Sequence, residues 1–141
     1  MPCHYNIYPE LNLALFTYQG VLRANEVVAL ADMVDSDPLY TRTINELGDF
    51  RNLEKVDFDA NTLTNLSTLL MGLYLRSSRN KKISMLVPNT SLHSSAKTFA
   101  SIVSASTPIS IRIFETLKPA LGYLDLTPED LPRETPVLQD L

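Results

Sequence analysis

The sequence predicts an α/β domain with the element order ββαβαβαβα, built on a mainly parallel mixed sheet with helices chiefly on one face. Three observations support this fold class. The chain of 141 residues is long enough for one domain with a sizeable core, and 45% of its residues are hydrophobic while 20% are charged. Stretches with strand and helix periodicity alternate along the chain. Such alternation brings the strands together in parallel through right-handed crossovers.

Residues 5–8 and 11–18 are predicted to open the chain as a β-hairpin. Both runs are rich in aromatic and aliphatic side chains, and Pro9 with Glu10 between them favours a tight turn. The hairpin is expected to add an antiparallel edge to the sheet.

A helix is predicted next, capped by Asn25 and stopped by Asp37 and Pro38. Its apolar residues recur at helical spacing on one face: Val27, Leu30, Ala31 and Val34. A strand over residues 43–49 is expected to follow, because a helix precedes this stretch and another comes after it.

The broadest apolar stripe runs through residues 61–78 and predicts the main core helix. The stripe consists of Leu63, Leu66, Leu69, Leu70 and Leu73. Four cations follow it, namely Arg76, Arg79, Lys81 and Lys82. We interpret them as surface cations that stabilise the C-terminal end of this helix rather than as a phosphate-binding patch. A phosphate site would need backbone N–H groups, which lie at the other end of a helix.

Residues 82–87 and 109–114 are predicted strands with a helix between them. The apolar face of that helix is made of Leu92, Ala96, Phe99 and Val103. A last helix is expected after Thr116, and it tolerates Pro119 in its first turn because the backbone N–H has no helical partner there.

Alternation within these two strands predicts how the sheet is covered. One face carries the aliphatic side chains Ile83, Met85, Val87, Ile109, Ile111 and Ile113. The other face carries Ser84, Ser110 and Arg112. A sheet covered on both sides has continuous aliphatic strands, so helices are expected chiefly on the aliphatic face. The mixed face is expected to be wet, covered by a partner, or part of a binding cavity.

The predicted core joins the central helix, the last two strands and the helix between them. It is expected to contain Leu66, Leu70, Leu73, Ile83, Met85, Phe99, Ile111 and Ile113.

Residues 1–126 are expected to form the domain, and residues 127–141 a proline-rich C-terminal arm. Thr127 and Pro128 predict one helical turn, followed by an extended segment. The apolar residues of the arm are too many for a solvated tail: Leu131, Val137, Leu138 and Leu141. We expect the arm to lie in a groove of its own subunit or of a neighbouring one, and a flexible tail without a structural role is the alternative.

Several short motifs resemble the SpoIIAA-like proteins, which belong to the STAS-type and CRAL-TRIO-like small α/β domains. They are F-T-Y-Q-G-V-L at residues 16–22, D-P-L-Y at 37–40, G-D-F-R at 48–51 and R-I-F-E-T-L-K-P-A-L-G-Y-L at 112–124. In order and spacing the resemblance covers residues 5–126. It implies a STAS-like fold, frequent dimerisation and mostly uncharacterised bacterial members.

The resemblance does not extend to the phosphorylation switch of anti-sigma-factor antagonists. Those proteins, which are similar in fold, carry a phosphorylatable serine in a turn before a central helix. The corresponding residues 48–53 contain no serine. The switch is therefore not carried over to this chain.

Charge and composition exclude several classes of function. A net charge of -4 repels polyanions, so no nucleic-acid partner is expected. Cys3 is the only cysteine, which indicates a reducing cytoplasmic environment. The first residues lack the features of a secretory signal. The most apolar stretch, residues 66–75, is too short to span a bilayer, so no membrane span is expected.

No catalytic constellation, metal site or cofactor is predicted. His4 and His93 are the only histidines, and neither lies at a metal-ligand spacing from Cys3 or from a carboxylate motif. The chain is therefore not expected to be an enzyme.

Candidate ligand-binding residues lie where parallel strands are predicted to end. One group opens a helix after the strand over residues 82–87: Asn89, Thr90, Ser91, His93 and Ser94. Open α/β sheets bind ligands at such places, although these side chains also serve as ordinary helix caps. Asp49 and Arg51 are expected at the same rim or in an ion pair that positions the loop. Arg112 on the mixed face completes the set.

Three functions stay open at this level. We favour a non-catalytic interaction or regulatory module that acts as a homodimer or with a regulatory protein partner. The absence of a catalytic constellation and the resemblance support this choice. The homodimer is predicted from the mixed face and from the aromatic side chains of the opening strands: Tyr5, Tyr8, Phe16 and Tyr18. A small-molecule or lipid-like ligand-binding protein is the alternative, which an apolar pocket would favour. An enzyme comes third.

Overall fold

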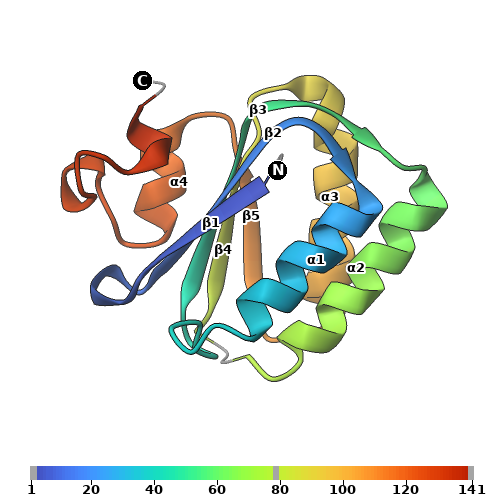
Figure 1. Cartoon of the computed structure of the whole chain (residues 1–141), viewed down its shortest axis with the longest axis horizontal. Coiled ribbons are helices and arrows are strands. Elements are labelled where there is room, and N and C mark those ends of the chain that lie inside the picture. The colour runs from blue at the N-terminus through green and yellow to red at the C-terminus, as the bar shows by residue number, and fades with distance from the viewer. Residues whose placement is uncertain (1–2, 78–79, 140–141) are drawn as a thin grey trace.

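The computed structural model describes residues 3–77 and 80–139, which form a five-stranded sheet with helices on both sides (Figure 1). The strands are β1 (Cys3–Tyr8), β2 (Leu13–Arg23), β3 (Asn45–Asp57), β4 (Lys82–Leu86) and β5 (Ser110–Phe114). They lie side by side in chain order. β1 is antiparallel to β2, and the other neighbours are parallel. The predicted mixed sheet and the order ββαβαβαβα are confirmed.

The helices of the described residues are α1 (Ala24–Asp35), α2 (Ala60–Tyr74), α3 (His93–Ser106) and α4 (Leu117–Tyr123). The first three cover one face of the sheet, and α4 lies on the other face with the C-terminal arm (Figure 1). The prediction that helices lie chiefly on one face is therefore confirmed. α1 follows β2 directly, without a loop between them.

Some boundaries differ from those predicted. Asn25 does not cap α1, which begins at Ala24. Instead, the Glu26 side chain accepts a hydrogen bond of 3.0 Å from the backbone N–H of Arg23. β3 continues past Asp49 to Asp57, because its second half pairs with β2. Three predicted residues lie outside the described ranges: Ser78, Arg79 and Leu141.

β2 and β3 extend beyond the end of β4 as a two-stranded ribbon. β4 pairs only with residues 46–49 of β3, whereas β2 pairs with β3 as far as Asp57. Two register shifts interrupt this pairing near Gly20, whose φ of 67° favours glycine. Such bulges bend a strand, and the ribbon turns towards the N-terminal ends of α1 and α2 (Figure 1).

The sheet divides the apolar core in two. Of the predicted core residues, Leu66, Ile83 and Met85 are buried, whereas Leu70, Leu73, Phe99, Ile111 and Ile113 are half-buried. All of them lie on the side of α1, α2 and α3. A second core on the side of α4 was not predicted, and its fully buried members include Leu13, Leu15, Leu47, Leu86 and Leu121.

Around Ser84 the mixed face is covered by the same chain, which corrects the expectation of a wet face, a partner or a cavity at that residue. Ser84 is fully buried, and its hydroxyl donates to the Ala120 carbonyl oxygen of α4 at 2.7 Å. Ser110 and Arg112 stay exposed on the edge strand β5, where Arg112 lies over the Tyr123 ring at 5.4 Å. A serine whose hydroxyl is satisfied by a backbone carbonyl is no obstacle to burial.

The C-terminal arm closes the second core. The predicted helical turn forms at Pro128–Asp130, where the Asp130 carboxylate accepts a hydrogen bond of 2.8 Å from the backbone N–H of Thr127. A further turn at Pro136–Leu138 replaces the expected extended chain. Leu131 and Val137 of the arm are buried among the residues of this core. The arm thus lies in a groove of its own chain, one of the two expected placements.

Candidate functional site

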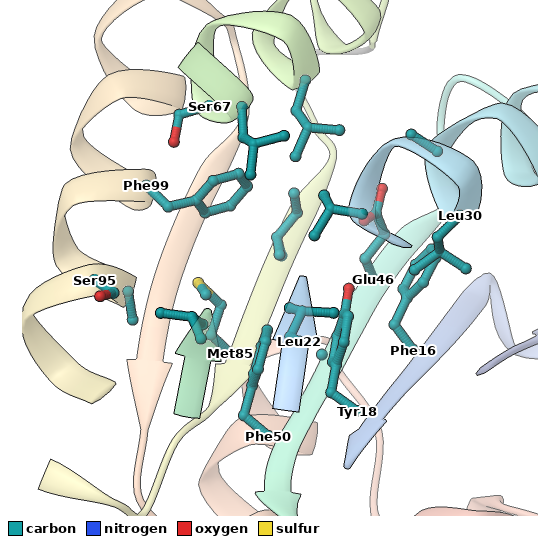
Figure 2. A pocket seen from close by; sticks show the side chains of 18 of the residues that line it. Phe16, Tyr18, Leu22, Leu30, Glu46, Phe50, Ser67, Met85, Ser95 and Phe99 are labelled. Atoms are coloured by element: carbon teal, nitrogen blue, oxygen red, sulfur yellow. The ribbon is translucent and has the colours of Figure 1, made fainter. Parts of the chain in front are cut away.

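A cavity of about 210 Å³ lies between the sheet and helices α1, α2 and α3 (Figure 2). Its wall is mostly apolar, with side chains from the strands and from all three helices. Prominent among them are Tyr18, Leu22, Leu30, Phe50, Met85 and Phe99. The cavity lies on the aliphatic side of the sheet, opposite the mixed face on which the sequence placed a possible cavity.

An aromatic pair forms the sheet side of the cavity. The rings of Tyr18 on β2 and Phe50 on β3 are stacked, with centroids 4.4 Å apart and planes 5° from parallel. Gly48 makes room for this arrangement, because a Cβ at that position would lie 2.7 Å from the Phe50 ring. The glycine and the phenylalanine of the G-D-F-R motif therefore shape the cavity together.

The Tyr18 hydroxyl points into the cavity and makes no hydrogen bond with any residue in the described part of the chain (Figure 2). Burial raises the pKa of Tyr18, and the negative charge of Glu46 adds to this effect. The hydroxyl therefore stays protonated and can donate a hydrogen bond.

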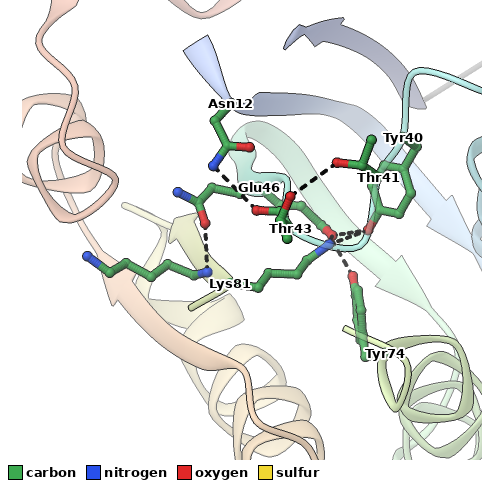
Figure 3. A network of polar contacts seen from close by, with 9 residues as sticks. Asn12, Tyr40, Thr41, Thr43, Glu46, Tyr74 and Lys81 are labelled. Carbon is green, nitrogen blue, oxygen red and sulfur yellow. Dashed lines mark hydrogen bonds and ion pairs between the residues drawn. The ribbon is translucent and has the colours of Figure 1, made fainter. Parts of the chain in front are cut away.

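A buried polar network closes one end of the cavity (Figure 3). Its centre is Glu46 of β3, which is 4% exposed and lies 2.7 Å from the Nζ of the fully buried Lys81. The hydroxyls of Tyr40 and Tyr74 both donate to the Glu46 carboxylate, the second at 2.9 Å. Lys81 also donates to the Tyr40 hydroxyl at 2.7 Å and lies over the Tyr40 ring.

This network is satisfied from within the protein. Burial first, and then the charge of Glu46, raises the pKa values of Tyr40 and Tyr74, so both phenols remain hydrogen-bond donors. The four side chains come from β3, from the end of α2, from the loop after α1 and from the residue before β4. We therefore assign the network a positioning role, because it ties these segments together at the end of the cavity.

The interpretation of Lys81 as a surface cation at a helix end was wrong. It lies fully buried beside Glu46, whereas Arg76 lies 3.7 Å from Asp35 and Lys82 lies 3.7 Å from Asp125 at the surface. One sequence signal pointed to the buried pair. Glu46 alternates with the inward-facing Gly48 on β3, and a carboxylate on a buried strand face needs a cation nearby.

The candidate residues after β4 interact with one another or with the backbone. The Asn89 side chain accepts hydrogen bonds from the backbone and the hydroxyl of Ser91, at 3.1 and 2.8 Å. A ring nitrogen of His93 lies 2.6 Å from the Val87 carbonyl oxygen. Thr90 and Ser94 are exposed. The Asn89 contacts are the local cap that the sequence left open as an alternative.

Asp49 and Arg51 lie on the other face of the sheet, under the arm. The buried Asp49 carboxylate accepts two hydrogen bonds from the Arg51 guanidinium, at 2.9 and 3.0 Å. Arg51 also donates to the Val137 carbonyl oxygen of the arm at 2.5 Å. This ion pair holds the arm in place, and Arg112 lies apart from it on β5. The structure therefore does not bring the candidate residues together at one rim.

Other functional features were sought among the described residues. No group of three or more His, Cys, Asp and Glu side chains in these ranges could hold a metal ion. Within the same ranges, none of the helices has the length and apolar character needed to cross a membrane.

Comparison with known proteins gives no matching family model and no matching curated protein. Among solved structures, the chain is similar to an uncharacterized protein of the DUF3478 family with a SpoIIAA-like fold from Shewanella loihica PV-4. The TM-score is 0.59 at 16% sequence identity, and the alignment covers 86% of this chain and 93% of that one. In agreement with the motifs at residues 16–22 and 112–124, this chain has a SpoIIAA-like fold.

Proposed function

We propose that this chain is a non-catalytic protein that binds a small, largely apolar molecule in the cavity between the sheet and helices α1, α2 and α3. The observation that supports this proposal is the cavity of about 210 Å³ with its apolar wall. A dry protein cavity of about 150 Å³ is large enough for benzene, whereas drug-sized ligands occupy roughly 300–1,000 Å³. The cavity therefore suits one ring or a short chain rather than a long-chain lipid.

The polar side chains around the cavity favour binding over chemistry. Tyr40 and Tyr74 are held protonated, and Glu46 is paired with Lys81. Ser67, on the helix side, donates its hydroxyl to the Leu63 carbonyl oxygen at 2.8 Å. In the described part of the wall these groups do not form an activated nucleophile with a base, which is the arrangement that nucleophilic catalysis requires.

Filling the cavity tests the proposal. Ala31 of α1 lines the cavity, so Ala31→Leu places extra methyl groups in it, whereas Ala29 is exposed on the same helix and Ala29→Leu is the matched control. With isopropylbenzene as the probe and NMR titration as the measurement, we expect saturable binding to the wild type. Ala31→Leu should weaken it by about tenfold or more, because the ligand and the new side chain compete for one space.

The control should bind isopropylbenzene as the wild type does. Absence of binding to the wild type, or equal affinities of the wild type and Ala31→Leu, would contradict the proposal.

The predicted homodimer rested on the mixed face and on four aromatic side chains of the opening strands. Around Ser84 the mixed face is covered by α4, and of the four aromatic side chains Phe16 and Tyr18 line the cavity. Tyr5 donates to the Asp37 carboxylate at 2.9 Å, and Tyr8 packs against the second core. Homodimerisation stays a prediction, and sedimentation at tens of micromolar protein would test it.

A further inference from the structure

The Tyr18 hydroxyl is a donor held in position without an acceptor. Stacking on Phe50 fixes the ring, and the hydroxyl points into the cavity without a hydrogen-bond partner among the described residues. Tyr18 is half-buried and its hydroxyl is accessible from the cavity, so a water molecule or a ligand inside the cavity can accept its hydrogen bond.

Glu46 is a nearby acceptor, but other donors already occupy it. One of its oxygens accepts from Tyr74, and the other accepts from Tyr40 and faces Lys81 at 2.7 Å. Tyr18 is therefore not needed to satisfy the network. Its hydroxyl is left for a group inside the cavity.

A negatively charged ligand does not match the described wall of the cavity. The carboxylates in this wall are Asp35 and Glu46, and Lys81 lies behind Glu46 rather than in the wall. An anion would be moved out of water towards two acids without a cation of its own, which is strongly unfavourable.

A positively charged ligand does not match either. The charge of Glu46 is compensated by Lys81 at 2.7 Å. Asp35 lies at the rim with its side chain 54% exposed, and Arg76 is 3.7 Å away. An ammonium ion would therefore lose its water without gaining a free carboxylate.

We infer that the cavity selects a neutral molecule with a hydrogen-bond acceptor, such as a carbonyl oxygen, which the Tyr18 hydroxyl holds. This inference rests on the proposed function and names the class of ligand. The apolar remainder of the ligand fills the space between Phe50 and the helices, and Tyr18 is the residue that determines specificity.

Four probes with one ring and equal numbers of non-hydrogen atoms separate these properties. They are acetophenone, with a neutral acceptor; isopropylbenzene, without one; benzoate, an anion; and α-methylbenzylammonium, a cation. Titration followed by NMR gives a Kd for each with the wild-type chain at neutral pH. Benzoate and the ammonium probe should bind at least about tenfold more weakly than acetophenone, because each carries an unpaired charge into the cavity.

Tyr18→Phe removes the donor and keeps the ring. We expect the ratio of the acetophenone Kd to the isopropylbenzene Kd to rise roughly 2- to 12-fold, which corresponds to one neutral hydrogen bond. Comparing this ratio between the wild type and the variant cancels the difference in hydrophobicity between the two probes. Tyr123→Phe is the matched control, because Tyr123 packs on Phe114 at the other face of the sheet, and it should leave the ratio unchanged.

A second measurement does not depend on the variant folding. The carbonyl stretching frequency of acetophenone bound to the wild type should lie below its value in an alkane solvent, because a donated hydrogen bond weakens the C=O bond. An alkane-like frequency, an unchanged ratio in Tyr18→Phe, or tighter binding of benzoate would overturn the inference. The proposed function survives any of these results if isopropylbenzene still binds the wild type and binds Ala31→Leu more weakly. Failure of both would remove the proposed function as well.

Discussion

The two faces of the sheet are closed in different ways. Under α4 and the arm, residues such as Leu13, Leu47 and Leu121 are fully buried. Under the three longer helices, Leu70 and Leu73 of α2 remain half-buried because they border the cavity. Protein interiors are normally packed as densely as organic crystals, with few voids larger than a water molecule. The helix side of this sheet departs from that rule, and the proposed ligand site lies there.

Each face also contains a buried acid with its own cation. On the arm side, Asp49 pairs with Arg51, which also binds the arm through the Val137 carbonyl oxygen. On the cavity side, Glu46 pairs with Lys81, and two tyrosines join them. Both acids lie on β3, and each ion pair makes hydrogen bonds to segments that cover one face of that strand. The difference is that one pair seals a packed core, whereas the other frames an open space.

The largest loss of stability is expected when the ion pair beside the cavity is broken. Lys81→Met leaves the Glu46 carboxylate buried without its cation, so we expect the free energy of unfolding to fall by about 3–5 kcal/mol. Urea denaturation at neutral pH measures the loss. Lys82→Met is the control, because Lys82 is partly exposed and lies 3.7 Å from Asp125; its loss should stay within about 1 kcal/mol. Similar losses in the two variants would show that the network does not hold this side together.

A pair of leucine truncations compares the packing of the two faces directly. Leu121→Ala opens a cavity in the packed second core and should cost about 2–5 kcal/mol. Leu70→Ala only enlarges an existing space around a half-buried side chain, so its cost should be smaller by at least about 1 kcal/mol. Both losses are read from urea unfolding curves with unchanged slopes. Equal losses would contradict the difference in packing.

The smallest expected effect is a dependence of stability on alkaline pH. The pKa values of Tyr40 and Tyr74 are raised in the folded chain, whereas the pKa of a tyrosine in an unfolded chain is about 10. Below that pH the folded and the unfolded chain both keep these protons, so the phenols do not make the free energy of unfolding depend on pH. Above it the unfolded chain loses protons that the folded chain retains, so stability falls as the pH rises.

Tyr74→Phe should make this alkaline decline shallower in urea unfolding measured over a series of pH values. Leu121→Ala, which lowers stability without removing a phenol, should keep the wild-type slope. A slope that Tyr74→Phe leaves unchanged would show that this hydroxyl does not carry the effect.

Much of the fold could be predicted, because hydrophobic periodicity reports directly on helices and strands. The alternation in Ile83 and Met85 placed the aliphatic face correctly, and the turn at Pro128 formed where the capping pattern indicated. The covering of the mixed face could not be predicted in this way. Ser84 is polar in the sequence, yet a single hydrogen bond to α4 makes it suitable for a packed interior.

The candidate site was harder to predict, because a cavity depends on side chains from many elements at once. Tyr18 was singled out as an aromatic residue but was expected at an interface. Asn89 and His93 were selected for their place at a strand end, but Asn89 caps the following turn at Ser91 and His93 contacts the Val87 carbonyl oxygen. Lys81 was assigned by its position after a helix, and only the three-dimensional pairing with Glu46 shows its environment.

The arm over α4 has a consequence for how the protein is made. Chains emerge from the ribosome with their N-terminal segments first and tend to fold in that order. Leu13, Leu15 and Leu47 belong to β2 and β3, yet Leu131 and Val137, which help to cover them, are synthesised later. During translation these leucines therefore stay exposed until the arm is made, and exposed apolar surface favours aggregation and chaperone binding. Slow translation through residues 117–138 would lengthen that exposure.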